Sequence, residues 1–441
     1  MKQLYYHIIT FGCQMNKNDS ERMETILAKI GLKTTDSLEQ ADVIVFNTCS
    51  VRDSAEARIF GQGANFAKLK QKKPNLIVAI TGCMPGRDKT KELKKRIPWV
   101  DLYFGNEEMI HLPKWLAELN PEMRPMEDLE TDYLNIHPNY HSQFQAFVSI
   151  QTGCNHFCTY CVVPYARGTE GNRSLKSILD EINNLDNKGY KEITLLGQIV
   201  NHYIAPDPEY FSKDNIYTKN DFAKLLWEIN KTKNIERVHW TAPHPIYMDD
   251  EMIDALTLPK QVNFIHLPVQ SGNDEILKKM NRRHDRQFYI DIIKKIRTKR
   301  QDIAIGTDII VGFCGETEEQ FQDTVSLFKI CDFDISYHAK YSTRSGTVAD
   351  KMFKDDVLKS EKKKRWQVLQ DLMEEITYAK NQKYVGQKVS VLVERCNDGW
   401  CEGNSNEMKL TRFKGSELII GTIQTPEIYK AGTWLLWGRV V

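Results

Sequence analysis

Short apolar runs alternate with amphipathic stretches along most of this 441-residue chain, and that alternation is typical of parallel sheets covered by helices. At about 100–200 residues per domain, a chain of this length is expected to form two to four domains. The first alternating series occupies residues 1–117 and predicts an N-terminal parallel α/β domain. Its expected strands are Tyr5–Thr10, Val43–Asn47 and Leu76–Thr81, and its expected helices are Asn18–Ile30 and Ser54–Lys70.

Residues 118–141 interrupt the pattern with three prolines and an acidic run at Glu127-Asp128, which is the composition of a linker. A second series of six strand–helix units follows in residues 142–377. Six units are too few for a complete eight-fold barrel, so we expect a partial (β/α)6 barrel. The expected strands are Ala146–Ile150, Glu192–Leu196, Val238–Ala242, Phe264–Leu267, Ile303–Val311 and Asp334–Tyr341, and the expected helices are Leu175–Leu185, Phe222–Asn230, Gln287–Lys299 and Glu318–Lys329.

A long charged helix, Lys359–Tyr384, leads out of the barrel, and residues 378–441 show no further helical period. Strands are expected at Lys388–Glu394, Leu418–Thr422 and Thr433–Val441, with a turn at Asn397-Asp398-Gly399, so a small all-β barrel fits best. From residue 380 onward, nine Lys and Arg face six Asp and Glu, a net charge of +3, and aromatic residues lie among them. Basic and aromatic side chains on a small barrel favour RNA, which is held by phosphate contacts and base stacking.

Composition narrows the class of protein. Apolar residues at 41% and charged residues at 27% are globular values, and a formal net charge of +1 restricts any nucleic-acid surface to a local patch. Basic residues also concentrate at Lys278–Arg300 and at Lys362–Arg365, although a charged helix face is usually just solvated surface. The densest apolar run, Leu76–Ile80, is far too short for a membrane span, and residues 1–30 carry acidic side chains rather than an export signal. We therefore expect a cytoplasmic protein with no membrane partner.

Ten cysteines are too few for a disulfide scaffold, and in a reducing cytosol clustered thiols indicate metal binding or catalysis. Disulfides are accordingly not expected. Cys396 and Cys401 flank a turn that allows them to face each other, but two ligands do not make a zinc site. Cys314 and Cys331 are expected to pack as small apolar groups.

Cys154, Cys158 and Cys161 form a Cys-x3-Cys-x2-Cys array directly after an expected strand. Cubane iron–sulfur clusters are normally held by four Cys thiolates, so three would leave one iron open to an exogenous reactant. A zinc site is the alternative, but a structural zinc wants four N or S ligands, and His156 is too close in sequence to be an easy fourth.

Cys13, Cys49 and Cys83 lie 36 and 34 residues apart, each just beyond the end of one of the first three expected strands. The carboxyl ends of neighbouring parallel strands share one edge of a sheet, where ligands bind. These thiols are thus expected to converge on a second cluster. Three separate buried structural thiols are the alternative.

The spacing of the Cys154 array, with the flanking residues Val162–Gly168, resembles the radical S-adenosylmethionine superfamily, and in particular its methylthiotransferases. The segment Gly12–Asn16, with Asp19-Ser20-Glu21, is similar to the MiaB-type tRNA methylthiotransferases. A relative that modifies a ribosomal-protein aspartate typically has Pro-Lys in place of Gln14-Met15. The resemblance covers essentially the whole chain, and its tail is similar to the RNA-binding TRAM domain.

This resemblance implies two 4Fe–4S clusters, one held by Cys154, Cys158 and Cys161 and an auxiliary one held by Cys13, Cys49 and Cys83. It also implies an activity: 2-methylthiolation of N6-isopentenyladenosine at position 37 of tRNA. One S-adenosylmethionine would donate methyl, and a second would yield the radical that removes hydrogen from carbon 2. The cofactor carries the difficult chemistry. An electron donor such as flavodoxin or ferredoxin and a sulfur-supply protein are implied as further partners.

Four polar residues at strand ends of the barrel are expected to contact S-adenosylmethionine, because they match family segments that line its pocket: Gln198, Gln270, Ser271 and Asp308. Two departures affect this pocket, since Ile199 stands where the family usually has Asn and Thr169 where it commonly has Arg.

Three alternatives remain open at this point: a methylthiotransferase acting on threonylcarbamoyl-adenosine in tRNA, one acting on a ribosomal protein, and a non-catalytic iron–sulfur RNA-binding sensor. The sensor accounts for two clusters and a basic barrel, but gives no reason for a site with an open iron.

Overall fold

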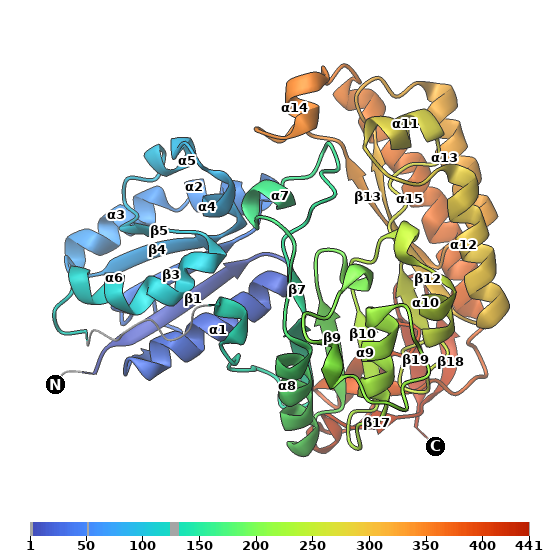
Figure 1. Cartoon of the computed structure of the whole chain (residues 1–441), viewed down its shortest axis with the longest axis horizontal. Helices are drawn as coiled ribbons and strands as arrows, with labels where there is room; N and C mark the ends of the chain where they lie inside the picture. The colour runs from blue at the N-terminus through green and yellow to red at the C-terminus, as the bar shows by residue number, and fades with distance from the viewer. Residues whose placement is uncertain (1–2, 51–52, 124–131, 441) are drawn as a thin grey trace.

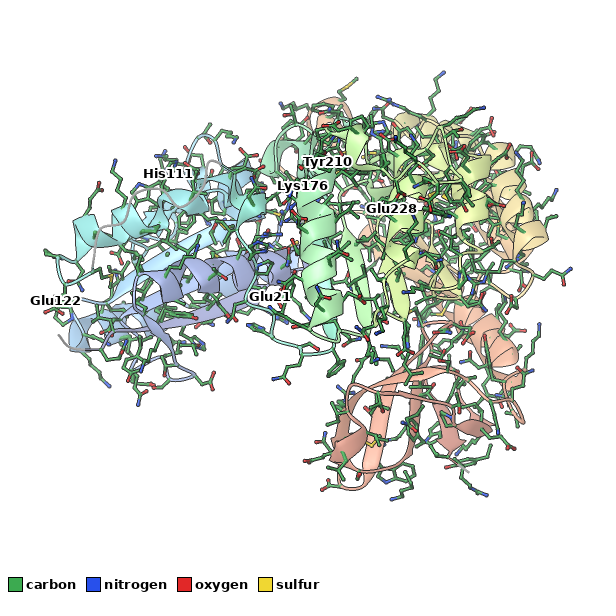
Figure 2. All side chains as sticks on the ribbon, turned by 60° about the horizontal axis from the view of Figure 1, so that its bottom comes forward. Glu21, His111, Glu122, Lys176, Tyr210 and Glu228 are labelled. Carbon is green, nitrogen blue, oxygen red and sulfur yellow. A yellow bond between two sulfur atoms is a disulfide. The ribbon has the colours of Figure 1, made fainter. Side chains whose placement is uncertain are left out.

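The computed structural model describes residues 3–50, 53–123 and 132–440 of the chain. Figure 1 shows the N-terminal part, in blue, beside a central barrel, in green and yellow. Figure 2 brings the C-terminal sheet forward, below the barrel. This order of α/β part, partial barrel and all-β part is the expected one.

The N-terminal part is built on a five-stranded sheet in the order β2-β1-β3-β4-β5, with every pair parallel. Every residue of the two central strands is buried, because helices cover both faces of the sheet. The strands predicted here are confirmed. The bounds are β1 Tyr5–Phe11, β2 Lys33–Thr34, β3 Val43–Thr48, β4 Ile77–Gly82 and β5 Leu102–Tyr103.

The helices of this part include one correction. The single helix expected at Ser54–Lys70 is wrong, since the chain breaks it at Gly61-Gln62 into two helices. Gly63 starts the second helix against Trp99, whose Nε1 would lie 3.2 Å from a Cβ at this position. The bounds are α1 Gln14–Lys29, α2 Asp53–Phe60, α3 Gly63–Lys72, α4 Cys83–Arg87, α5 Glu92–Lys95, η1 Asn106–His111, α6 Leu112–Leu119 and η2 Tyr133–Asn135.

The segment between the two α/β parts contributes to a core. Tyr133, Leu134 and Ile136 are buried in the hydrophobic cluster of the N-terminal part. The acidic run Glu127-Asp128 lies outside the described residues. Residues 132–136 therefore pack onto the N-terminal part, and the 118–141 linker boundary stays a prediction.

The central part has six parallel strands in chain order, as a (β/α)6 partial barrel requires. They form two three-stranded sheets, β6-β9-β10 and β11-β12-β13, linked by an isolated parallel bridge between Val238 and Gln261. One continuous apolar core fills the space between strands and outer helices. The strand bounds are β6 Gln145–Ser149, β9 Glu192–Leu196, β10 Arg237–Trp240, β11 Phe264–His266, β12 Ala304–Val311 and β13 Ile335–Lys340, with a small hairpin of β7 Gln151–Thr152 and β8 Gly171–Asn172.

The outer helices follow the strands as expected, with bounds shifted by a residue or two. Short helices and turns occupy the loops at the carboxyl ends of the strands. The helices of the central part, long and short together, are α7 Val163–Ala166, α8 Leu175–Asn187, η3 Val200–His202, η4 Pro208–Tyr210, α9 Asp221–Asn230, η5 Pro245–Tyr247, α10 Asp250–Ala255, α11 Asp274–Lys279, α12 Arg286–Lys299, α13 Glu318–Cys331, α14 Val348–Met352 and α15 Lys359–Gln382. None of the described helices has the length and apolar character needed to cross a membrane.

The C-terminal part is a curled six-stranded sheet, a half-barrel in the order β17-β14-β15-β16-β19-β18. It docks on the barrel through Arg237, which donates to Asn404 O at 2.7 Å and to Ser405 O at 3.0 Å. The bounds are β14 Val391–Asn397, β15 Trp400–Ser405, β16 Leu410–Lys414, η6 Glu417–Ile419, β17 Ile423–Gln424, β18 Glu427–Ala431 and β19 Leu436–Arg439.

The strand expected at Leu418–Thr422 is wrong, because that apolar run forms η6 and projects outward, leaving Leu418 92% exposed. Strands β15, β16, β17 and β18 are not predicted by the sequence pattern. Apolar content alone is a poor guide to short strands whose outer face is polar.

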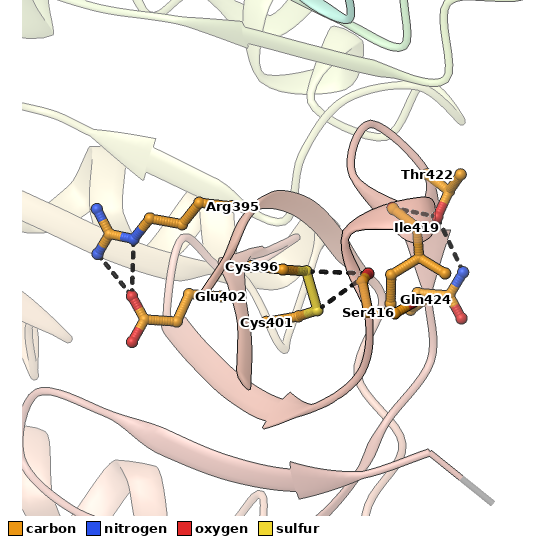
Figure 3. Close-up of a disulfide and its surroundings, with 8 residues drawn as sticks. All are labelled: Arg395, Cys396, Cys401, Glu402, Ser416, Ile419, Thr422 and Gln424. Carbon is orange, nitrogen blue, oxygen red and sulfur yellow. Dashed lines mark hydrogen bonds and ion pairs between the residues drawn. A yellow bond between two sulfur atoms is a disulfide. The ribbon is translucent and has the colours of Figure 1, made fainter. Parts of the chain in front are cut away.

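The sequence-based expectation of no disulfide is also wrong: Cys396 and Cys401 are bonded in the structure (Figure 3). The two residues are directly opposite each other in the antiparallel pair β14–β15, with Cα atoms 4.0 Å apart. Both Sγ atoms lie near Ser416 O, at 3.3 and 3.5 Å.

Candidate active site

The three dispersed cysteines follow neighbouring strands of the N-terminal sheet. The ends of β1, β3 and β4 are in register at Phe11, Thr48 and Gly82. Each of these residues lies one or two positions before one of the cysteines. Cys13 is the N-cap of α1, Cys49 follows β3, and Cys83 begins α4. Since neighbouring strands lie about 4.8 Å apart, the register alone brings the three cysteine loops to one edge of the sheet.

A buried amide network holds the Cys13 loop against the end of β3. Asn16 Nδ2 donates to Asn47 Oδ1 at 2.9 Å, and Asn47 Nδ2 donates to Asn16 O at 2.7 Å. Asn16 Oδ1 in turn accepts from the Cys13 backbone N–H and thiol, each at 3.3 Å. Cys13 is exposed, whereas Cys49 and Cys83 are buried, so this site has one open side.

The Cys154 array forms a loop that begins just after β7. Backbone N–H groups of His156 and Val163 donate to Cys154 Sγ and Cys161 Sγ at 3.5 and 3.4 Å. Amide donors directed at sulfur are a common way to orient and tune thiolate ligands of iron.

The end of α11 fixes the middle of this loop. Asn281 Nδ2 donates to His156 O at 3.0 Å and to Phe157 O at 3.1 Å, and Thr159 N donates to Met280 O at 3.0 Å. Phe157 has a φ of +49°, in the left-handed region, and the two bonds from Asn281 hold it there.

The three thiols of the array share one electrostatic environment. Burial raises the pKa of Cys154 to about 11 and that of Cys161 to about 12, and the neighbouring Cys158 thiol adds to both shifts. Arg282 opposes them, with its Nη1 3.6 Å from Cys158 Sγ. A positive group beside the three thiols favours their thiolate form, which is the form that binds iron.

A cavity of about 680 Å³ opens beside this loop and runs to the C-terminal part. Its wall includes Cys161, Gln270, Asp308, Tyr337 and Trp434. Its volume suits a nucleotide-sized ligand.

Of the four residues expected to contact the cofactor, Gln270 and Asp308 line this cavity, and the other two lie elsewhere. Asp308 Oδ1 lies 3.1 Å from His266 Nε2. Ser271 is fully buried, and its Oγ lies 3.5 Å from Thr324 Oγ1. Gln198 is half-buried in the loop after β9. Ile199, the first departure from the family pattern, is buried and donates its N–H to Gln151 Oε1 at 3.1 Å.

The residues present fit iron–sulfur groups. In the described ranges no three His, Cys, Asp or Glu side chains enclose a single metal ion. The thiolates of a cubane each bind a different iron, so they need not converge on one point. A loop with three thiols, of which Cys161 lines a nucleotide-sized cavity, suits a cluster with one iron open to a small-molecule ligand.

The outer face of the C-terminal sheet carries cations against aromatic rings. Lys414 Nζ lies 4.0 Å from the centre of the Trp400 ring, Lys430 Nζ lies 4.8 Å from that of Trp437, and Arg439 stands over Tyr429 at 5.4 Å. Within the described part of the chain, the cations of these three pairs form no ion pair with a carboxylate. Aromatic rings that can stack on bases, next to positive charges that are not paired with a carboxylate, suit single-stranded RNA.

Sequence reasoning missed several residues of the site. Tyr337 and Trp434 come from β13 and from the turn before β19, and only the fold brings them to one cavity wall. Arg282 belongs to a basic stretch that the sequence predicts as a surface patch, yet it is half-buried, with Nη1 3.6 Å from Cys158 Sγ. No local motif marks these residues.

Two family models match the chain. Residues 148–328 match the radical SAM superfamily, and residues 5–105 match a family described as uncharacterized protein family UPF0004. The first match contains the Cys154 array and the barrel strands β9 to β12, and the second contains Cys13, Cys49 and Cys83. Radical SAM proteins use S-adenosylmethionine and 4Fe–4S clusters, and this chain accordingly uses both.

Solved structures share the fold at low sequence identity. The radical S-adenosylmethionine methyltransferase TsrM from Kitasatospora setae aligns with a TM-score of 0.55 at 14% identity, covering 77% of this chain and 73% of that one. The cobalamin-dependent S-adenosylmethionine radical enzyme OxsB aligns with a TM-score of 0.52 at 11% identity, covering 85% of this chain and 56% of that one.

Curated relatives are much more similar in sequence. A tRNA-2-methylthio-N(6)-dimethylallyladenosine synthase from Thermoanaerobacter sp. (strain X514) is 41% identical over 100% of this chain and 93% of its own length. One from Clostridium botulinum (strain Okra / Type B1) is 41% identical over 99% of this chain and 97% of its own length, and one from Clostridium perfringens (strain SM101 / Type A) is 39% identical. With about two-fifths identity along its entire length, the chain belongs to the family of tRNA-2-methylthio-N(6)-dimethylallyladenosine synthases, which are radical SAM transferases.

Proposed function

We propose that the protein converts N6-isopentenyladenosine at position 37 of tRNA to its 2-methylthio derivative. The observation that carries this proposal is the cavity beside Cys161, because it extends from the cysteine array to Trp434 of the C-terminal part. A radical site that opens toward a basic, aromatic sheet suits a reaction on a nucleobase of a bound RNA.

In this proposal Cys154, Cys158 and Cys161 hold the cluster that binds S-adenosylmethionine, and Gln270 and Asp308 contact that cofactor in the cavity. The bound cofactor supplies the radical and the methyl group. The chain's own part is to place and enclose it. The N–H donors to sulfur orient the thiolates, and Arg282 offsets their negative charge.

Cys13, Cys49 and Cys83 hold the auxiliary cluster in this proposal, which provides the sulfur. The exposed position of Cys13 supports this role, since a sulfur-bearing group must be reached by substrate and be renewed. Renewal requires a sulfur-supply protein, and radical formation requires an electron donor such as flavodoxin or ferredoxin.

The far wall of the cavity suits the base. Tyr337 and Trp434 are 59% and 51% exposed, which is unusual for large rings and leaves their faces free for stacking. Asn381 Nδ2 fixes the turn before Trp434 by donating to Gly432 O and Thr433 O at 2.8 and 2.9 Å. Rigid aromatic faces bind a planar, prenylated base at little entropic cost.

The deciding experiment incubates the reduced, reconstituted protein with S-adenosylmethionine and tRNA, and then analyses the nucleosides by mass. We expect 2-methylthio product with isopentenylated tRNA and none with unmodified tRNA. Equal product from tRNA bearing threonylcarbamoyl-adenosine would overturn the substrate assignment. Absence of any product, together with intact clusters and tRNA binding, would favour the RNA-binding sensor.

The C-terminal sheet gives a separate prediction. Changing Lys414, Lys430 and Arg439 together to Ser should weaken tRNA binding and reduce the slope of log K against log salt by about 2–3, because each lost phosphate contact releases about one counterion fewer. Binding is to be measured at several salt concentrations.

The matched control for this variant is Lys294→Ser with Lys295→Ser, on α12 in the other basic patch. Iron content and cofactor cleavage should be unchanged in both variants. A larger loss of affinity and salt slope in the α12 variant would assign RNA binding to the Lys278–Arg300 patch instead.

A further inference from the structure

A buried ion pair crosses between the N-terminal part and the barrel. Arg167 Nη2 lies 2.6 Å from Asp19 Oδ2, and the two side chains are 2% and 0% exposed. The same carboxylate oxygen accepts a second bond, from Asn106 Nδ2 at 2.6 Å. Asp19 follows Cys13 by six residues and Arg167 follows Cys161 by six, so the pair joins the chain segments of the two cysteine sites.

Arg167 also reaches the auxiliary cysteines. The guanidinium of Arg167 is a neighbouring positive charge and hydrogen-bond donor to the buried Cys83 thiol. The backbone confirms how closely the two parts meet: a Cβ on Gly86 of α4 would lie 2.0 Å from Ala166 O at the end of α7. The helix that begins at Cys83 therefore packs backbone to backbone against the residue before Arg167.

The residues just after Arg167 are tied to the other cysteine site. The Cys154 N–H donates to Gly168 O at 3.2 Å. Gly153 has a φ of +71°, and a Cβ there would lie 1.9 Å from Thr169 O. A displacement of the 166–169 segment would thus be transmitted to the first cysteine of the array as well as to α4.

Part of this pair is left without a partner. Arg167 Nη1 and Asp19 Oδ1 are both buried and make no hydrogen bond within the described residues. A buried charged donor without an acceptor is costly, so a further group is expected to meet it. Sulfur of an iron–sulfur group bound through Cys83 is an acceptor of the right kind and sign.

We propose that Arg167 is a positioning residue, oriented by Asp19, which donates to sulfur at the auxiliary cluster and fixes that cluster relative to the radical site. The inference rests on the proposed function in one respect, that Cys13, Cys49 and Cys83 bind a cluster. Its consequence is coupling: with Arg167 in place, radicals formed at one site lead to sulfur insertion at the other.

The test uses the full-length chain with Arg167→Met, Arg167→Lys and Asp19→Asn. Each is first placed in a background where Cys154, Cys158 and Cys161 are Ala, so that the auxiliary cluster alone contributes to the signal. Loss of a positive donor disfavours the reduced, more negative cluster, so the Met variant should show a more negative midpoint potential and an altered electron paramagnetic resonance spectrum. The Lys variant keeps the charge, and its potential should stay closer to that of the parent.

In the otherwise intact protein, the number of methylthiolated nucleosides formed per S-adenosylmethionine cleaved should fall at least about tenfold in Arg167→Met, because uncoupled cleavage continues. The matched control is Arg365→Met, which removes another buried ion pair, Arg365 Nη1 to Glu316 Oε2 at 2.9 Å, with side chains 5% and 1% exposed. It should lower stability without changing potential or coupling.

A potential, spectrum and coupling ratio in Arg167→Met no different from those of Arg365→Met would overturn the inference and leave the pair as interface packing. If Arg167→Met does not fold, Asp19→Asn decides, because it removes the carboxylate that orients Arg167. Parental coupling and a parental spectrum in that variant would overturn the inference too. Failure of the proposed function would give a different result. The protein with Cys154, Cys158 and Cys161 changed to Ala would then bind no auxiliary cluster, or the unchanged protein would form no methylthiolated product.

Discussion

Replacing Cys154, Cys158 and Cys161 together by Ala will abolish reductive cleavage of S-adenosylmethionine and leave about half of the roughly eight irons that two cubanes hold. The thiols that share the Arg282 environment are then gone, while the auxiliary site in the N-terminal sheet is untouched. Iron content after anaerobic reconstitution and the yield of 5′-deoxyadenosine are the two measurements.

The matched control is Cys314→Ala with Cys331→Ala, which removes two buried thiols outside both sites. It should keep full iron and full cleavage. Cleavage at the parental rate by the triple variant would remove the array from the radical site.

Replacing Cys13, Cys49 and Cys83 by Ala should have a different effect. Sulfur insertion into tRNA should fall below detection, since the proposed sulfur-bearing cluster is lost, while some cleavage to 5′-deoxyadenosine remains because the Cys154 array and its cavity are intact. Nucleoside mass analysis and deoxyadenosine yield, measured in the same reaction, separate the two effects.

Iron content gives the check on this second variant, which should also retain about half of the metal. Methylthiolated tRNA from a protein lacking all three thiols would contradict the assignment of the auxiliary cluster as the sulfur source. Loss of both clusters would instead indicate that the N-terminal site is needed to fold the barrel.

The sequence by itself determined the main strands of the two α/β parts, most of their long helices, and the places of the six cysteines in the two candidate sites. The continuous apolar runs Val43–Phe46 and Leu76–Ile80 can be recognised in the sequence because a parallel strand is buried on both faces. Each cysteine then follows its strand in the chain. Local periodicity failed for the C-terminal part, whose short strands have mixed outer faces, and for the break at Gly61-Gln62.

Only the tertiary structure determined which side chains are buried where these elements meet, and which partners they have. The polar face of α1 looks solvated in sequence, yet Asn18, Asp19 and Arg22 are fully buried there, and Glu21 lies where the N-terminal part meets the barrel (Figure 2). Their partners come from far along the chain: Arg167 for Asp19, and Phe147 O for Asn18 Nδ2 at 3.0 Å.

The cavity wall and the disulfide also depend on contacts that only the folded chain makes. Trp434 reaches the cavity of Cys161 only through the docking of the C-terminal sheet, and Cys396 meets Cys401 only through the register of β14 and β15. A sequence encodes local conformation through the period of its apolar residues. Which polar side chains become buried depends on long-range packing, because a charge is buried only when a distant partner is brought to meet it.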